Sequence, residues 1–441
     1  MAVFRGRFRP VGGNDGDEGG GAVKKRVNVH DLRKGMYVSA LDRPWTTTPF
    51  LFQGFEINSE EQVEQLKQLC QHVFVDPARE RVPGISKTGG GALPDTVKLP
   101  SVDHKGLLRR SAHLRAISYR KDITSVEQEI GEARVLEAHG RDLVKTIMDD
   151  VRLGHSLDSG RARTLVAGMV QSVVRNPDAL VWFTHLKKSD EYTAVHSLRV
   201  CILALTFGRH LGLTPEELNV LGIGALLHDI GKLKVPLDIL NKPGRLTVPE
   251  YEIMKSHVPY GVKILEATSS IPAEAIDVAR NHHERYSGVG YINGFQGDRI
   301  GLFGLIGAIV DAYDAITSDR VYKKGVAPYD ALKQLYDGRG RDFHGGLVEQ
   351  FIQCMGVYPI GSIVEMKDGA IGVVVTVNRE RRLRPRVAII LDTDRRPCPR
   401  ATVVDLFETK ADEGPQRYEI RRVLPSGTYG IDPTVYLPES A

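Results

Sequence analysis

The order of hydrophobic and polar residues predicts a small mixed domain in the first part of the chain. Residues 24–78 contain three short strand-like runs, "KKRVNVHDL", "MYVSALD" and "HVFVDP", and one helical pattern, "SEEQVEQLKQLC". Ser59 and Gln62 stand at the start of that helical pattern with the spacing of a capping box. We therefore expect a compact α+β domain here.

Helical patterns take over in the middle of the chain. Within the range 108–184, residues 108–150 are charged and favour helix, and over 158–176 the apolar residues fall on one helical face, with Asp158 or Ser159 as a cap. Residues 185–356 follow as a succession of helical segments separated by short breaks rich in glycine and proline. We expect a helical connector over the first of these ranges and a helical domain over the last.

The clearest helix start in this domain is Thr214-Pro215-Glu216-Glu217, which combines a capping box with proline at the first helical position. The apolar stripe that follows predicts a helix packed in the core. The stretch "LLHDIGKLKVP" continues it, which places His228 and Asp229 in the last turn. A helix that only packed would not need an imidazole and a carboxylate at that end.

The pattern changes again near the end of the chain. Over residues 357–441 the runs "GSIVEM", "AIGVVVTV" and "PRVAIIL" are strand-like, and Asp368-Gly369 marks a hairpin turn. This region is expected to form a small β module. Residues 1–23 are glycine-rich and predicted to be a disordered tail, and 79–107 are predicted to be a linker. The fold class is therefore mainly α.

Composition narrows the function classes. The chain has 441 residues and a net charge of only +4, so no global basic field argues for nucleic acid as a partner. Its four cysteines are far apart and form no CxxC pair, which argues against a disulfide framework and a thiolate zinc site. No signal peptide is visible and no run of about 18 apolar residues predicts a membrane span, so we expect a cytoplasmic protein.

Histidines and aspartates gather in the helical domain. Each of seven such residues lies in or beside an apolar helical stretch: His196, His228, Asp229, His257, His282, His283 and Asp311. A single histidine there is ordinarily a hydrogen-bonded core residue. Seven unpaired groups would each cost several kcal/mol on burial, whereas a metal centre would satisfy them together.

The ligand types favour particular metals and a particular chemistry. Imidazole and carboxylate without thiolate suit Fe or Mn, and zinc or nickel less specifically. Seven ligands exceed one coordination sphere, so two divalent metal ions sharing a bridging carboxylate are expected. Two ions about 3.5–4 Å apart cleave phosphoesters, because they generate hydroxide from a shared water and draw charge from the phosphate oxygens.

A phosphate substrate also needs cations nearby. Lys232 follows Asp229 by three residues, and Arg320 and Lys323 follow Asp311 by nine and twelve. If the helix that carries Asp311 continues that far, all three lie roughly on one face of it. Arginine would offer phosphate a bidentate fork and lysine a point charge, although a solvated basic helix end is the alternative.

Five segments together resemble one known family. They are "HSLRV", "HDIGKLKVP", "ILNKPGRLTVPEYEIMKSHVPYGVKIL", "HHERYSGVGYINGFQGDRI" and "DAYDAITSDRVYKK". In order and spacing they are similar to the HD-GYP family of bacterial cyclic di-GMP phosphodiesterases, a subset of the HD metal-dependent phosphohydrolases. The resemblance covers about residues 185–355 and implies an HD-type helical bundle. Residues 25–78 resemble the uncharacterised domain often found ahead of HD-GYP domains.

The resemblance implies a role for each site residue. One metal would be held by His196, His228, Asp229 and Asp311. The second would be held by His257, His282 and His283, with Asp229 bridging. The phosphates of cyclic di-GMP would contact Lys232, Arg320 and Lys323, with Tyr291 near the substrate. The family reaction is hydrolysis of a 3′–5′ phosphodiester to linear pGpG, in some members on to GMP, with Asp229 and Lys232 as the catalytic residues here.

Three positions depart from the family pattern. The signature GYP reads Gly290-Tyr291-Ile292, so the proline that would stiffen the loop for docking GGDEF-domain proteins is absent. Ser287 replaces the usual aspartate before glycine. Tyr192 stands where members with three metals carry glutamate, which favours two metals.

Two other functions stay open at this stage. The altered loop is compatible with a cyclic-dinucleotide receptor that binds without turnover and signals through its end domains. A different nucleotide substrate, such as a mixed cyclic GMP–AMP or a dNTP, is the other alternative.

Overall fold

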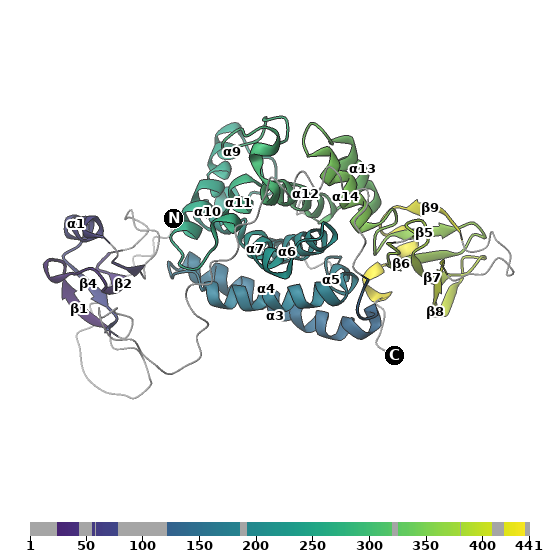
Figure 1. The fold of residues 1–441 in the computed structure, drawn as a ribbon, viewed down its shortest axis with the longest axis horizontal. Helices are drawn as coiled ribbons and strands as arrows, with labels where there is room; N and C mark the ends of the chain where they lie inside the picture. The colour runs from purple at the N-terminus through teal and green to yellow at the C-terminus, as the bar shows by residue number, and fades with distance from the viewer. Residues whose placement is uncertain are drawn as a thin grey trace, which may run out of the picture. The chain divides into compact units, whose positions relative to one another are not determined.

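The computed structural model describes residues 24–43, 55–57, 59–77, 121–185, 192–319, 325–379, 381–407 and 419–436. The chain divides into two compact units (Figure 1). The first consists of Met1–Gly89 and Gly154–Ser156, and the second of Gly90–Leu153 and Leu157–Ala441. The tail and linker predicted from sequence, and both Arg320 and Lys323, lie outside the described residues.

The first unit is the small α+β domain expected from the sequence. Its antiparallel sheet has the order β1-β4-β2-β3, formed by Lys25–Asn28, His72–Val75, Tyr37–Leu41 and Phe55–Glu56. Helix α1 (Glu60–Leu69) begins at the predicted capping box, in which Ser59 and Gln62 bond reciprocally. Val38, Ile57 and Leu66 are fully buried in the core between sheet and helix.

The second unit begins with helices that pack into one bundle. They are α3 (Val126–Arg152), α4 (Ser159–Arg175), α5 (Pro177–Phe183), α6 (Tyr192–His210) and α7 (Pro215–Leu227). The predicted caps are confirmed, since Asp158 caps α4 and Thr214 with Glu217 forms the capping box of α7. Helix α7 is buried from Val220 to Leu227 on every side rather than along one stripe, because α4, α6 and α11 surround it.

The helices that follow complete the bundle, and the last of them, α14, packs beside α6 (Figure 1). They are η5 (Ile230–Lys234), α8 (Leu237–Leu240), α9 (Val248–Lys255), α10 (His257–Glu266), α11 (Ala273–Asn281), η6 (Gly297–Ile300), α12 (Leu302–Thr317), α13 (Pro328–Asp337) and α14 (Gly345–Met355). This succession of helices is the helical domain that the sequence pattern predicts.

The C-terminal β module is confirmed as a five-stranded antiparallel sheet in the order β8-β7-β6-β5-β9. The strands are β5 (Ile363–Met366), β6 (Ile371–Thr376), β7 (Arg386–Leu391), β8 (Pro397–Asp405) and β9 (Ile420–Leu424), followed by η8 (Thr428–Gly430) and η9 (Pro433–Tyr436). The predicted hairpin joins β5 to β6, with Gly369 at φ 98° as the turn requires.

Buried ion pairs attach this module to the helices. The Arg379 guanidinium contacts the carboxylate of Asp178 at the start of α5 and lies 3.1 Å from that of Asp122. The Val377 amide donates to Asp178 at 3.1 Å. The module is therefore fixed to the bundle mainly through the Arg379–Asp178 pair, because both of its side chains are largely shielded from water.

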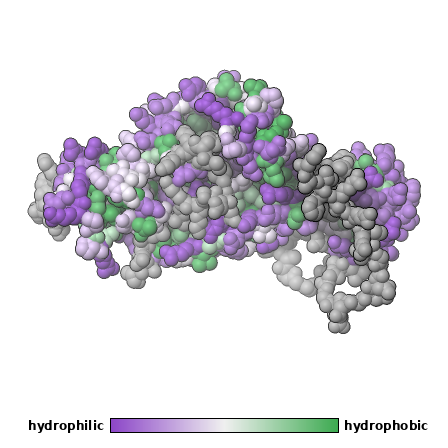
Figure 2. All heavy atoms as spheres, turned by 180° about the vertical axis from the view of Figure 1, so that it is seen from behind, coloured by the Kyte–Doolittle hydropathy of each residue, from purple (hydrophilic) through white to green (hydrophobic). Residues whose placement is uncertain are grey.

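Polar residues predominate on one face of the molecule. On the face shown in Figure 2, hydrophobic residues form small separate groups within a largely hydrophilic surface. Among the helices that the structure describes, none combines the length and the apolar composition needed to cross a lipid bilayer.

Candidate metal centre

All seven predicted ligands converge in the helical bundle. Their ligand atoms form two neighbouring groups, in each of which the atoms lie within 4.8 Å of one another. One group is His196, His228 and Asp311, and the other is Asp229, His257, His282 and His283. Helices α6, α10 and α12 and the ends of α7 and α11 supply them, so the bundle joins residues more than a hundred positions apart.

The ligands that are neighbours in sequence lie at helix ends. His228 is the residue after the last turn of α7 and Asp229 precedes the short helix η5, so the pair lies just beyond the turn that the sequence predicted. His282 likewise follows α11. The backbone turns at these points, and His228 and Asp229 therefore enter different ligand groups.

The Asp229 carboxylate lies between the two groups. Its Oδ2 atom is 3.3 Å from His228 Nε2 and 3.5 Å from His196 Nε2. Its Oδ1 atom is 3.4 Å from His257 Nε2 and 3.7 Å from His282 Nε2. One oxygen thus faces each group, which is the arrangement that a bridging carboxylate requires.

Backbone carbonyls orient three of the imidazoles. The Nδ1 atom of His228 lies 2.8 Å from Ala225 O, that of His257 lies 2.7 Å from Met254 O, and that of His282 lies 3.0 Å from Ala279 O. Each Nδ1–H therefore donates a hydrogen bond to a backbone carbonyl on the side of the ring that faces away from the site. The Nε2 lone pairs then point into the site. Carbonyl or carboxylate partners of this kind are typical of histidines that bind metals.

The buried atoms inside the site fit divalent cations. The Nε2 atoms of His228, His257 and His282 and the Oδ1 atom of Asp229 are buried and have no hydrogen-bond partner among the described residues. Leaving such atoms unmatched costs about 1–3 kcal/mol each. A pair of cations would satisfy them together, and imidazole with carboxylate is a donor set that transition metals accept.

The protonation states agree with this fit. Burial, together with the nearby His228, lowers the pKa of His282 to about 3. Burial opposes ionisation of Asp229, yet Lys232 and His228 hold the pKa of its carboxyl well below the usual range. The imidazole is therefore neutral and the carboxylate ionised at neutral pH, which are the forms that coordinate metals.

His196 is the exception among the histidines. Burial alone would lower its pKa, but hydrogen bonds to Asp229, Asp311 and Asp314 raise the pKa of the imidazole well above its ordinary value. Without a cation the ring itself thus supplies a positive charge among the three carboxylates.

Asp314 is a functional candidate that the sequence reasoning missed. Its Oδ2 atom lies 2.7 Å from His196 Nδ1 and accepts a hydrogen bond from Ser318 Oγ at 3.1 Å. Arg199 in turn donates to Ser318 Oγ at 3.0 Å. The available signal was the spacing of Asp311 and Asp314, which places both on one face of α12.

Asp314→Asn is expected to weaken metal binding by about 10- to 100-fold. The carboxylate of Asp314 orients the His196 imidazole and makes it more basic, and a neutral amide would do neither as well. Competition between the protein and a chelator for Mn(II) measures the change. Asp330→Asn, at an exposed position on α13, is the matched control. Unchanged affinity in the Asp314 variant would contradict this role.

A glycine lets α10 approach the site. A Cβ atom at Gly231 would overlap with the carbonyl oxygen of His257 and the backbone of Gly261. Only glycine therefore permits η5 to pack on α10, and this contact holds His257 beside Asp229.

Gly231→Ala should destabilise the fold by about 1–3 kcal/mol, because the backbones must separate. Urea denaturation measures the loss. Gly131→Ala in α3 is the control, since no atom lies within 4 Å of its added methyl group, and it should stabilise by about 1 kcal/mol. Equal stability of the Gly231 variant and the wild type would refute the close-packing argument.

The predicted substrate-binding residues have different outcomes. The Lys232 ammonium contacts the Asp229 carboxylate, and the Tyr291 ring stacks on His283 with 4.7 Å between centroids. The condition under which Arg320 and Lys323 would share one helical face with Asp311 is not met. Helix α12 ends at Thr317, where Ser318 takes an extended conformation.

Glu284 holds the signature loop in place without the missing proline. Its buried carboxylate accepts hydrogen bonds from the amides of Asn293 at 2.7 Å and Gly294 at 3.2 Å. A Cβ atom at Gly290 would overlap with the backbone of Glu284 and Arg285. The loop thus folds tightly onto the segment that carries His283.

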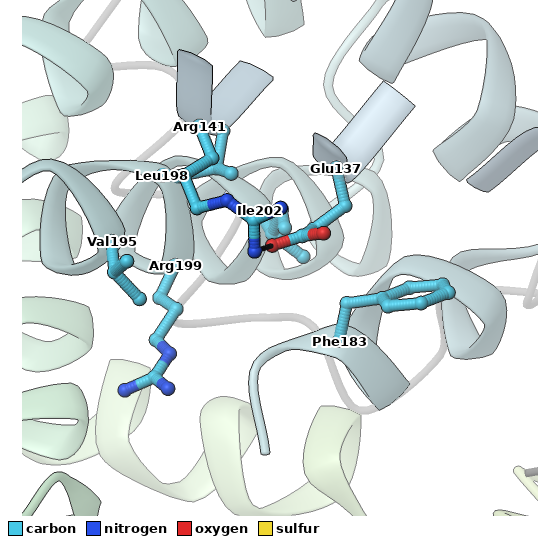
Figure 3. Close-up of a pocket in the computed structure, with 7 residues that line it drawn as sticks. All are labelled: Glu137, Arg141, Phe183, Val195, Leu198, Arg199 and Ile202. Atoms are coloured by element: carbon cyan, nitrogen blue, oxygen red, sulfur yellow. Dashed lines mark hydrogen bonds and ion pairs between the residues drawn. The ribbon is translucent and has the colours of Figure 1, made fainter. Parts of the chain in front are cut away.

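A small cavity between α3, α5 and α6 is separate from these ligand groups. Its lining consists of Glu137, Arg141, Phe183, Val195, Leu198, Arg199 and Ile202. Figure 3 shows Glu137 and Arg141 paired, while the Arg199 guanidinium points away from them. None of the seven candidate ligands lines it.

Three family models match the chain. One described as an HD domain matches residues 181–345. One described as a domain of unknown function (DUF3391) matches residues 24–162, and one described as a KOW domain associated with HD domain matches residues 363–411. The HD match includes every residue of both ligand groups.

Several characterised proteins are similar. The cyclic di-GMP phosphodiesterase PA4108 of Pseudomonas aeruginosa is 34% identical over 385 residues, which are 87% of this chain and 89% of the relative. The cyclic di-GMP phosphodiesterase response regulator RpfG of Xanthomonas campestris pv. campestris is 35% identical over 43% of this chain and 50% of its own length. A 3′3′-cGAMP-specific phosphodiesterase 2 of Vibrio cholerae is 36% identical over 36% of this chain and 31% of its own length. From the ligand set, the fold and the similarity over nearly the whole length, the chain belongs to the HD-GYP family of cyclic di-GMP phosphodiesterases.

Proposed function

We propose that this chain hydrolyses a 3′–5′ phosphodiester of cyclic di-GMP to linear pGpG at a dinuclear His/Asp centre. The observation that carries the proposal is the position of Asp229, which directs one carboxylate oxygen toward each ligand group. The relatives named as cyclic di-GMP phosphodiesterases support the choice of substrate.

The ligand groups suggest how the metal ions would be held. His196, His228, Asp229 and Asp311 would bind one ion, and Asp229, His257, His282 and His283 would bind the other. Fe or Mn suits this donor set. Bound there, the ions supply a water of lowered pKa and neutralise charge on the phosphate.

The other groups of the chain bind and position the substrate. The Lys232 ammonium contacts the Asp229 carboxylate in this structure. Once bound cations neutralise that carboxylate, the ammonium can turn to a non-bridging phosphate oxygen. Arg320 and Lys323 are proposed to contact the phosphates as well. Water attacks phosphorus, the P–O3′ bond breaks, and the 3′ oxygen takes a proton, so that the 5′ phosphate remains on the product.

A mixed cyclic GMP–AMP is the second candidate substrate. The similarity to the 3′3′-cGAMP-specific phosphodiesterase of Vibrio cholerae favours it, although that match covers only 36% of this chain. Both substrates contain the same phosphodiester and at least one guanine.

The test combines metal analysis with a product assay. Protein purified without oxygen should contain Fe or Mn and convert cyclic di-GMP to pGpG with a higher kcat/KM than 3′3′-cGAMP. His228→Ala should abolish turnover, whereas His139→Ala, at an exposed position on α3, should not. Binding of cyclic di-GMP without any product under Fe(II) and Mn(II) would instead identify a receptor.

A further inference from the structure

A ladder of rings leads from the metal centre to the protein surface. The Tyr291 ring stacks on His283 at an interplanar angle of 27°. Tyr251 of α9 then meets Tyr291 edge to face, with 6.1 Å between centroids. His283 is half-buried and the Tyr251 residue is 45% exposed, so the ladder leads from a candidate ligand to solvent.

A lysine stands beside both outer rings. Lys255 lies one helical turn after Tyr251, and its ammonium is 5.5 Å from the centroid of Tyr251 and 5.8 Å from that of Tyr291. It also pairs with the exposed Glu252 at 2.8 Å. The ammonium is therefore held where two aromatic faces and solvent meet.

Helix α9, which carries both residues, makes little contribution to the core. None of its eight residues is buried, and Val248, Tyr251 and Ile253 are exposed. Because α9 buries none of its residues, the need to fill the core does not account for the placement of Tyr251 and Lys255 beside the metal centre.

We propose that Tyr251 and Lys255 form a base-recognition site, in which a guanine of the substrate stacks on the Tyr251 ring and accepts a hydrogen bond from Lys255. This inference rests on the proposed function, because it places the phosphate of a cyclic dinucleotide at the metal centre. The ladder then spans the path from that phosphate to its base.

Guanine and adenine differ in their hydrogen-bonding groups, so Tyr251 and Lys255 should affect the choice of base differently. Aromatic stacking accepts any base, so Tyr251 contributes affinity without selecting. Guanine presents two acceptors, O6 and N7, whereas adenine places an amino donor where guanine has O6. Lys255 has donors only, and it therefore favours guanine.

The test measures binding and turnover separately. Calorimetry on metal-free protein gives the Kd for cyclic di-GMP and cyclic di-AMP, and Mn(II)-loaded protein gives KM and kcat. Tyr251→Ala should raise the Kd for both dinucleotides and the KM for cyclic di-GMP by about tenfold, and Tyr251→Phe should restore them. Lys255→Met should weaken binding of cyclic di-GMP by about tenfold while cyclic di-AMP changes little.

Tyr260→Ala and Lys263→Met on α10 are matched controls, because both residues are exposed and have no described contact with the ladder. Wild-type Kd values and an unchanged preference for guanine in the Tyr251 and Lys255 variants would overturn the base site. Wild-type protein that binds cyclic di-GMP but makes no pGpG would overturn the proposed function. In that case the Kd values of the Tyr251 and Lys255 variants would still test the base-recognition site. Protein that neither binds nor cleaves cyclic di-GMP overturns both.

Discussion

Asp229→Asn is expected to reduce hydrolysis of cyclic di-GMP by about a thousandfold. The substitution keeps the shape of the side chain but replaces the charged oxygen pair that lies between the two ligand groups. A metal centre supplies several kcal/mol of stabilisation to the transition state, and each 1.36 kcal/mol corresponds to a factor of ten in rate. Loss of the bridge should also leave at most one ion per chain.

The rate is measured by chromatography of pGpG and the metal content by mass spectrometry of the same sample. Asp238→Asn on the neighbouring helix α8 is the control, because that carboxylate is exposed. Retention of two ions and of most of the activity in the Asp229 variant would mean that this carboxylate does not bridge.

Arg379→Met is expected to destabilise the protein by about 3–5 kcal/mol, the effect of removing one partner from a buried ion pair. Arg379 is 10% exposed and contacts both Asp178 and Asp122. Methionine would fill much of the same volume but would leave the buried Asp178 carboxylate without its cation. The β module should then separate from α5 before the bundle unfolds.

Urea denaturation gives the free energy of unfolding, and limited proteolysis reports whether the β module is released. Arg396→Met is the matched control, because its side chain is 77% exposed and its pair with Asp394 is worth little. Adding Asp178→Asn to the Arg379 variant should recover part of the loss. A single variant as stable as the wild type would show that the pair does not hold the module.

The sequence predicted the elements whose signals are local. Capping boxes at Ser59 and Thr214 mark helix starts because the side chain and the amide that it bonds are three residues apart. The hairpin at Gly369 is equally local. The seven candidate ligands could be identified from residue type, because buried imidazoles and carboxylates need a common partner.

Features that depend on tertiary contact could not be predicted in this way. The end of α12 at Thr317 has no glycine or proline to mark it, and Ser318 instead bonds back to Asp314. The contact of Lys232 with Asp229 depends on how η5 turns after α7. The close packing of α10 against Gly231 is a contact between two backbones, and the spacing of apolar residues in the sequence does not predict such a contact.

Titration of metal-free protein with Mn(II), followed by electron paramagnetic resonance, tests the central claim most directly. If Asp229 joins two ligand groups, the signal of free Mn(II) should appear only after two equivalents per chain, and the bound ions should give an exchange-coupled spectrum. Saturation at a single, magnetically isolated ion per chain would contradict the account.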